Sequence, residues 1–420
     1  MKQLLAITSL LLSTGLLLIG HGMQLTLLPL RTTALALPES LIGASASFYF
    51  LGFVAGCFII PRLITRIGHI RAFAVLSALM LSSILALDIL QNVVSLFGFR
   101  FLTGFAICGL YSVIESWLNS QTSPETRGRI LSIYTFVTLS SMTLGQLLIN
   151  VGPITSSTPF MLSAVFVALA IIPIGMTRKM APSPVESARA SFRLLYNRSR
   201  SAFSAALLSG LVAGSFWSLG AVFANKYSAN QVDITWFMTM GIAGGALLQY
   251  PIGWLSDKID RRHVLILLCA GGALSSAGVA LSVFQTWHLI TVFLFGAMVM
   301  PLYAMALATV ADVSSKEEFV TIGTTVLLTN ALGAVLAPIA LGQLMSALGA
   351  TSLFWSFAVM CVAIGGYIAL QLRDPRTVSI EAQTPFGVAA PDAAPNSFDL
   401  DPRAAEDPAD ASPKDPENPA

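Results

Sequence analysis

The chain has 420 residues, of which 55% are hydrophobic and only 10% are charged, and its mean hydropathy is +0.77. A water-soluble protein of this length needs far more polar residues to cover its surface, so the composition excludes a soluble enzyme or binding protein. The formal net charge of +2 is uninformative as a total, because the charges are distributed unevenly along the chain.

Apolar runs long enough to cross a bilayer, about 20 residues each, recur from end to end. They lie at 5–30, 40–61, 71–90, 95–118, 129–150, 159–177, 203–224, 233–255, 263–284, 287–311, 319–345 and 350–372. The first run resembles a signal peptide, but no small-residue cleavage site follows it and it continues through Pro29, which favours an uncleaved helix. The sequence therefore predicts an all-α polytopic membrane protein with twelve transmembrane helices.

Lysine and arginine gather in alternate loops. Beginning after the second run, these loops hold Arg62, Arg66, Arg71, Arg127, Arg129, Lys258, Arg261, Arg262 and Lys316. The central segment adds six more, whereas the intervening loops hold only Arg31 and Lys226. By the positive-inside rule, both termini and the central segment are expected to face the cytoplasm.

The pattern divides the chain into four segments. Residues 1–177 and 203–372 carry six runs each, 178–202 form a basic linker, and 373–420 form an acidic tail rich in Pro and Ala. The linker could lie on anionic lipid headgroups as an amphipathic helix, or it could be a soluble connection that fixes topology. The tail has few aromatic or branched residues with which to bury a core, so we expect it to be disordered and cytoplasmic.

The two halves are related by an ungapped offset of 192 residues. The offset aligns Gly52 with Gly244, Tyr111 with Tyr303, and RFLTG (100–104) with VFLFG (292–296). We therefore expect two pseudo-symmetric six-helix bundles, as in transporters that rock around a midplane site. The four cysteines, Cys57, Cys108, Cys269 and Cys361, lie inside apolar runs and are expected to be packing residues.

Residues 253–262, GWLSDKIDRR, place five charges between two apolar runs. At the same offset they lie over the loop that follows the second run. Such loops could pair with acids and helix ends across the bundle interface and hold the cytoplasmic side shut. The candidates for this latch are Asp257, Lys258, Arg261, Arg262, Arg62, Arg66 and Arg127. A loop that only fixes topology is the alternative, but it explains the arginines and not Asp257.

These residues resemble a family pattern. Gly253, Leu255, Asp257, Lys258, Arg261 and Arg262 are similar to the G-x-L-x-D-[RK]-x-G-R-[RK] loop signature of the major facilitator superfamily. Arg100 and Gly104 resemble its helix-4 R-x-x-x-G signature. The resemblance covers about residues 10–372, and ESWLNSQTSPETRGR and QYPIGWLSDK are similar to the YcaD-like branch of bacterial members. It implies a secondary transporter in a bacterial inner membrane.

The chain departs from the family pattern at three places. Pro61 and Thr65 stand where the first-half loop signature has glycine and an acid, which weakens that copy of the latch. Asp260 replaces a glycine of the second copy. Gly152-Pro153 lies only where the fifth run ends, so the mid-helix signature of drug/proton antiporters is absent, which argues against a typical drug antiporter.

The fourth run carries the strongest candidates for coupling. Arg100, Gly104, Cys108, Tyr111 and Glu115 fall within about 80° of one another at ~100° per residue, so they are expected to face the bundle interior. Glu115 could load and unload a proton beside a moving arginine, or it could form a permanent salt bridge with Arg62, Arg66 or Arg127. His21 lies deep enough for a proton role, or could be hydrogen-bonded to a neighbouring helix.

Other polar side chains predict a central cavity. They occur in several runs: Gln24, Arg31, Tyr111, Thr143, Gln146, Asn150, Tyr303 and Asn330, with Trp217 as an apolar wall. Amides and hydroxyls suit hydrogen bonding to a polar solute, but they equally serve to hold helices together. Arg31 could attract an anionic substrate or could snorkel to lipid phosphates.

Other classes of function lack support in the sequence. The four histidines show no metal-ligand spacing, and no phosphate-binding loop or nucleophile elbow occurs, so we expect no enzyme, no metal, no cofactor and no nucleic-acid partner. A receptor or scaffold would ordinarily use a folded extramembrane domain, for which no segment is long enough. We expect a monomeric transporter of a small organic solute by alternating access, coupled to a proton gradient, with direction open and multidrug efflux as an alternative.

Overall fold

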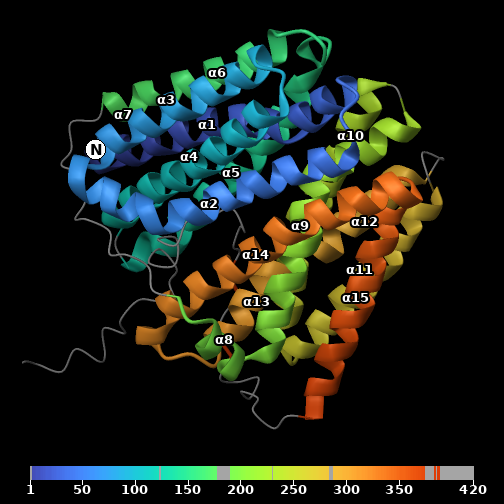
Figure 1. Ribbon diagram of the computed structural model, residues 1–420. Helices are drawn as coiled ribbons and strands as arrows, with labels where there is room; N and C mark the ends of the chain where they lie inside the picture. The colour runs from blue at the N-terminus through green and yellow to red at the C-terminus, as the bar shows by residue number, and fades with distance from the viewer. Residues whose placement is uncertain are drawn as a thin grey trace, which may run out of the picture.

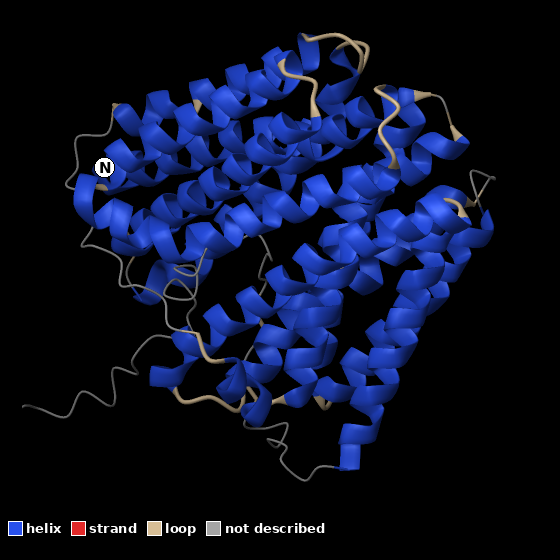
Figure 2. Cartoon of the chain, in the orientation of Figure 1, coloured by secondary structure: helices blue, strands red, loops and turns tan. Residues whose placement is uncertain are grey.

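The computed structural model describes residues 2–122, 124–176, 190–228, 230–282, 287–373, 383–384 and 386–387. Helices joined by short loops make up this part of the chain, which contains no strand (Figure 2). The helices of the first half are α1 (Lys2–Ala34), α2 (Glu39–Ile67), α3 (His69–Ile89), α4 (Val93–Ser120), α5 (Pro124–Leu148), α6 (Thr158–Leu169) and α7 (Ile171–Gly175). Those of the second half are α8 (Phe192–Arg198), α9 (Arg200–Tyr227), α10 (Gln231–Ser256), α11 (Arg261–Ser282), α12 (His288–Val299), α13 (Leu302–Ala311), α14 (Lys316–Leu348) and α15 (Ser352–Leu370). Two short 3-10 turns, η1 (Ile149–Val151) and η2 (Gln371–Arg373), follow α5 and α15.

Each predicted apolar run is covered by helix. The sixth run is covered by α6 and α7 together, and the tenth by α12 and α13, which are separated just before Pro301. Eleven of the resulting spans are long and apolar enough to cross a membrane. The remaining helix, α10, has 26 residues, including Gln249 and several glycines, and packs between α12 and α5 as a span does.

Local sequence sets the helix ends. The side chains of Asn92, Ser199 and Asn230 accept hydrogen bonds from backbone amides in the first turns of α4, α9 and α10, which satisfies donors that a helix start leaves unpaired. Gly68 has a φ of 81°, a backbone conformation that side chains with a Cβ atom rarely adopt. The chain therefore turns from α2 directly into α3 at this residue.

The internal repeat is visible in the helix crossings. A Cβ atom on Gly52 would lie 1.9 Å from the carbonyl oxygen of Phe101, and one on Gly244 would lie 1.9 Å from that of Phe293. Both members of the second pair lie 192 residues after those of the first. The α2–α4 and α10–α12 crossings therefore use equivalent glycines, which let two helix backbones touch.

A second pair of crossings repeats with a smaller spacing. A Cβ atom on Gly22 would lie 2.7 Å from the carbonyl oxygen of Met142, and one on Gly210 would lie 1.8 Å from that of Asn330. Gly210 follows Gly22 by 188 residues, as Asn330 follows Met142. The α1–α5 and α9–α14 crossings are thus equivalent as well, with a shift of four residues that the ungapped alignment did not predict.

The helices form two bundles, α1–α7 and α9–α15, which meet on the right of Figure 1 and separate toward the lower left. We call the end with the α2–α3 turn, the α10–α11 loop and the start of α14 the basic end, and the opposite end the far end. The bundles are bonded to each other at the far end. Glu39 pairs with Lys226 (2.7 Å) and accepts a hydrogen bond from Ser346 (2.9 Å), and Gln231 donates to the carbonyl oxygen of Ile149 (2.8 Å).

Two residues of the tail are bonded to the second bundle, while the disorder of the tail as a whole stays a prediction. The backbone amide and the hydroxyl of Thr384 both donate to Asp312 at 2.9 Å, and the amide of Phe386 donates to Asp257 at 3.0 Å. The Phe386 ring lies against Gly253. Two aspartate carboxylates and an aromatic contact thus hold residues of a segment that composition alone marks as unable to fold. Tail residues 374–382, 385 and 388–420 and linker residues 178–189 lie outside the described residues.

Candidate substrate site and gates

A polar cluster lies inside the first bundle, where α1, α2 and α4 meet. The Arg100 guanidinium carbon lies 4.5 Å from the centre of the Tyr49 ring, and the Tyr49 hydroxyl lies 3.3 Å from Nε2 of His21. All three side chains are buried. The structure therefore joins two of the predicted candidates, Arg100 and His21, through a tyrosine that the sequence did not single out.

Glu115 lies deeper along α4, toward the basic end, and is fully buried. Its carboxylate accepts a hydrogen bond of 3.1 Å from the hydroxyl of Tyr134 on α5. Of the arginines proposed as its partners, Arg62 and Arg66 are exposed at the end of α2. The side chain of Arg127 lies outside the described residues.

Several cavity candidates connect helices in this conformation. Gln146 on α5 donates to the carbonyl oxygen of Gly22 at 3.0 Å and accepts from the hydroxyl of Thr26. Gln24 donates to Ser163 on α6 at 3.3 Å. These amides are almost fully buried, so they contribute to the packing of α1 against α5 and α6 in the way that polar groups hold membrane helices together.

The remaining candidates do not gather at one place. Thr143 bonds to the backbone of its own helix, and Asn330 donates to the carbonyl oxygen of Ala206 at 3.5 Å. Asn150 lies exposed at the far end and accepts from Thr235 of the other bundle at 3.4 Å. The others lie within the helices: Tyr111 and Tyr303 are buried, and Trp217 is half-buried against Phe216.

Arg31 has a partner that neither sequence-based interpretation anticipated. Its guanidinium pairs with Asp88 at the end of α3 (3.2 Å) and donates to the carbonyl oxygen of Ile154 (3.2 Å). The two charged side chains are only 11% and 10% exposed. Arg31 therefore connects α1 to α3 near the far end, rather than extending to lipid phosphates.

The core of the second bundle is aromatic where that of the first is polar. Phe216, Phe237, Phe295 and Phe354 pack with ring centres 5.2–6.2 Å apart. At the repeat offsets, Arg100 corresponds to Val292 and Glu115 to Leu307. The buried ionisable candidates of the spans are thus concentrated in the first bundle.

The charged loop between α10 and α11 is bonded within its own bundle. Arg261 is 2% exposed and pairs with Asp257 (3.3 Å) and with Asp312 at the end of α13 (3.2 Å). Lys258 lies over the Trp254 ring at 3.6 Å. Thr384 and Phe386 bond to the same two aspartates, so Asp257, the acid of the predicted latch, is occupied by the tail in this conformation.

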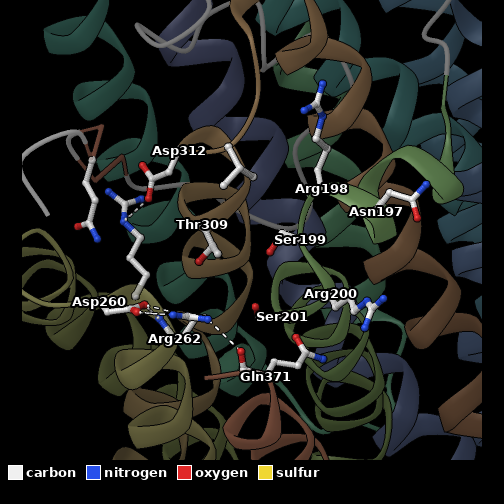
Figure 3. Close-up of a pocket in the computed structure, with 13 residues that line it drawn as sticks. Asn197, Arg198, Ser199, Arg200, Ser201, Asp260, Arg262, Thr309, Asp312 and Gln371 are labelled. Carbon is white, nitrogen blue, oxygen red and sulfur yellow. Dashed lines mark hydrogen bonds and ion pairs between the residues drawn. The ribbon is translucent and has the colours of Figure 1, made fainter. Parts of the chain in front are cut away.

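The loop borders a pocket at the basic end (Figure 3). Arg262 lies between Asp260, at 2.9 Å, and the carbonyl oxygen of Gln371, at 2.9 Å. Partial burial acts to raise the pKa of the Asp260 carboxyl, but hydrogen bonds from the Arg262 side chain and backbone outweigh it. The net result is a pKa below the usual range of aspartate.

Sequence reasoning missed the residues that complete these sites. Tyr49 and Tyr134 are partners across helices, and Asp312 is 51 residues from Arg261 along the chain. The only signal was indirect: Asp312 stands at the end of an apolar run, and Tyr49 lies one helical turn before Gly52, a residue aligned by the repeat. Partners of this kind become visible only when the helix crossings are known.

Comparison with known proteins settles the family. The family model of the Major Facilitator Superfamily matches residues 10–203 and again residues 202–398. The chain belongs to the major facilitator superfamily. The expected transporter fold, all-α and polytopic, is confirmed. Of its twelve expected spans, eleven form helices that are long and apolar enough to cross a membrane in the described part of the chain.

The relatives of this major facilitator include the YcaD-like branch, as the sequence resemblance predicted. This chain is 26% identical over 373 residues to the MFS-type transporter YcaD of Escherichia fergusonii, and the match covers 88% of this chain and 96% of the relative. It is 27% identical to YcaD of Salmonella newport, covering 90% and 97% of the two chains. Among solved structures, the nucleoside transporter NupG matches with a TM-score of 0.75, 13% identity and coverage of 88% and 99%. A bacterial homologue of the human lysosomal transporter Spinster, in an inward-facing and occupied conformation, matches with a TM-score of 0.70, 14% identity and coverage of 90% and 97%.

Proposed function

We propose that this major facilitator is a secondary transporter that moves a small organic solute by alternating access, with the proton gradient as its driving force. The observation that carries the proposal is the pattern of bonds between the bundles. Glu39, Lys226, Ser346 and Gln231 join them at the far end, while the acids of the basic-end loop are bonded within the second bundle and to the tail. The far end is held closed by bonds between the bundles while the acids of the other end are bonded elsewhere, as one state of alternating access requires.

The direction of this closure follows from charge. Because basic loops favour the cytoplasmic side, we propose that the basic end and both termini lie in the cytoplasm of a bacterial inner membrane. The bundles are then closed toward the outside and face the cytoplasm. In the opposite state we expect the loop around Asp257 to exchange its present partners for groups of the first bundle.

Proton coupling rests on Glu115. A charged carboxylate within an apolar span costs free energy. A carboxylate that is kept there therefore usually has a function, such as proton transfer. The Tyr134 hydroxyl, 3.1 Å from the Glu115 carboxyl group, can hydrogen-bond to either protonation state. A change in the access of water to α4 and α5 during rocking would then load and release the proton.

The test is flux in sealed liposomes. The purified protein is reconstituted, an inward pH gradient is imposed, and internal pH is followed while pooled metabolites or cationic drugs are added. Solute-dependent proton flux in the wild type, lost in Glu115→Gln, supports coupling. Solute flux without proton movement, unaffected by the substitution, excludes it and leaves a uniporter or exchanger. Absence of flux with every pool argues for a receptor or scaffold.

We further propose that the transporter acts as a monomer and that the linker contacts anionic lipid. In the described part of the linker, only some of the side chains are exposed and could contact lipid. Leu195 is fully buried against the second bundle, whereas Phe192 is 45% exposed beside Arg193. Omission of anionic lipid from the liposomes should therefore slow transport, and Arg193→Gln should reduce the sensitivity to lipid composition.

A further inference from the structure

Arg100 is a buried cation without a counter-charge in the described part of the protein. The residue is 6% exposed, and its Nε and Nη1 atoms have no hydrogen-bond partner there. The contact that the structure does provide is the face of the Tyr49 ring, 4.5 Å away. The other buried arginines differ: Arg31 and Arg261 both pair with aspartate.

An unpaired charge at this depth is expensive. Insertion scales give about 3 kcal/mol for an arginine at the centre of a membrane helix, and a cation–π contact returns only part of that. The fold itself does not need the charge. The residue equivalent to Arg100 in the second bundle is Val292. It is fully buried at the α10–α12 crossing, which corresponds to the α2–α4 crossing of the first bundle.

Among the other buried polar atoms of the first bundle that lack partners in the described part of the chain, two lie near this cluster. They are Nδ1 of His21 and Oε1 of Gln24, which lie one helical turn apart on α1. Nε2 of the same His21 ring lies 3.3 Å from the Tyr49 hydroxyl, and the Tyr49 ring stacks on Arg100. Buried polar groups are nearly always hydrogen-bonded in native proteins. Arg100 and His21 thus meet at Tyr49, and Gln24 lies one helical turn away and bonds to Ser163 on α6. Orphaned groups at these three neighbouring places indicate that a ligand completes them.

We infer that Arg100 binds the carboxylate of the transported solute, a small organic acid that also carries a hydrogen-bond donor. The inference rests on the proposed transport function and adds the class of substrate. A guanidinium offers N–H donors in a planar arrangement suited to carboxylate oxygens. Tyr49 holds its plane by stacking, while Gln24 accepts from a hydroxyl or amine of the solute. The aromatic second bundle supplies no competing charge at the equivalent positions.

The first arm of the test needs no ligand. Because the charge is uncompensated in the empty protein, Arg100→Met should raise the thermal unfolding midpoint of the purified full chain by about 2 °C or more. Arg261→Met is the matched control, since it removes a buried arginine that pairs with two aspartates and should lower the midpoint. A fall for Arg100→Met comparable to the control would overturn the inference, because it would show that Arg100 has a structural partner.

The second arm uses a pool of hydroxy- and amino-carboxylic acids and an equimolar pool of the corresponding amides. We expect the acids, and not the amides, to raise the unfolding midpoint of the wild type. Half-saturation should require at least about tenfold more acid in Arg100→Lys, as loss of one good charge-assisted contact implies, and the shift should vanish in Arg100→Met. Equal shifts with amides, no shift with either pool, or a shift that survives in Arg100→Met would each overturn the inference.

Flux separates this inference from the proposed function. If a cationic or neutral solute crosses liposomes at the wild-type rate in Arg100→Met, the protein is a transporter and the carboxylate assignment is wrong. If the acid pool stabilises the protein through Arg100 but no pool crosses, the site is supported and the transport proposal fails.

Discussion

At the scale of single residues, the Arg31–Asp88 pair allows the contribution of a buried ion pair to the free energy of unfolding to be measured. Both side chains are about one-tenth exposed, so Asp88→Asn leaves a buried guanidinium without its counter-charge. We expect the free energy of unfolding to fall by about 3–5 kcal/mol, measured by thermal or denaturant unfolding in detergent.

The matched control is the exposed pair Arg198–Glu318, whose side chains are 45% and 30% exposed. Glu318→Gln should change stability by less than about 1 kcal/mol. A double variant, Arg31→Met with Asp88→Leu, should recover part of the loss seen in Asp88→Asn. Equal effects at the buried and exposed pairs would contradict the burial argument.

Asp260 gives a prediction for pH. Its pKa in the folded protein lies below the usual aspartate range, so the ion pair with Arg262 contributes stability above about pH 4. That contribution is lost as pH falls through the folded pKa, because the carboxylate becomes protonated. Asp260→Asn should thus be less stable than the wild type at pH 7, by up to about 1 kcal/mol.

The two unfolding curves of the Asp260 experiment should begin to approach each other as pH falls below about 4, the pKa of an ordinary aspartate. They should meet only below the folded pKa of Asp260, which lies lower. A difference in stability that stays constant down to the lowest accessible pH would show that the substitution acts through packing instead.

At the scale of helices, the crossings predict where a methyl group is tolerated. A Cβ atom at Gly104 would lie 1.9 Å from the carbonyl oxygen of Tyr49, so Gly104→Ala must push α4 away from α2. We expect a loss of at least about 1–3 kcal/mol, measured as the unfolding midpoint.

Gly98, six residues earlier on α4, is the control for this crossing. Nothing lies within 4 Å of a Cβ atom there, so Gly98→Ala should be neutral or stabilise by up to about 1 kcal/mol through helix propensity. Comparable losses at both glycines would mean that the close approach of α2 and α4 is not what limits the substitution.

The helices are also where sequence reasoning worked best. Long apolar runs predicted the spans, because a membrane helix satisfies its own backbone and needs only about 20 apolar residues. The offset of 192 predicted the two halves, and the resemblance of the loop and helix-4 motifs indicated the family. The stripe through Arg100 and Glu115 was placed inside the bundle by periodicity alone. Their partners, Tyr49 and Tyr134, were not predictable because contacts between helices depend on crossing geometry, which composition does not encode.

At the scale of the whole molecule, the far-end bonds set the balance between states. Glu39→Gln removes the ion pair with Lys226, of which the lysine is 49% exposed. The population open at the far end should rise by up to about fivefold, the most that such a surface pair supports. Distance distributions between spin labels at the far ends of α2 and α14 would report the change.

Glu318→Gln again serves as the comparison for that experiment, because its partner Arg198 does not belong to the other bundle. If both substitutions leave the distance distribution unchanged, Glu39 and Lys226 do not hold the far end closed.

The tail should act on the loop that it covers. Phe386→Ala removes the ring from Gly253 but keeps the backbone bond to Asp257, whereas a chain ending at Arg373 loses every tail contact. We expect hydrogen exchange in the α10–α11 loop to rise modestly in the first variant and more in the second. Tyr367→Phe, which removes a hydroxyl bonded to Tyr196 and Gln371 and leaves the tail contacts in place, is the control. Unchanged exchange in the truncated chain would contradict the contact.

The repeated glycine crossings have one more consequence. When a polypeptide contains the same helix scaffold twice, the functional residues of the two copies can diverge while both copies keep the same helix packing. The first copy has Arg100, Glu115 and His21 where the second has Val292, Leu307 and Ser209. The second has Asp257 where the first has Thr65. We therefore expect the first copy to supply the coupling residues and the second the latch, so that two copies of either half alone would lack one of the two.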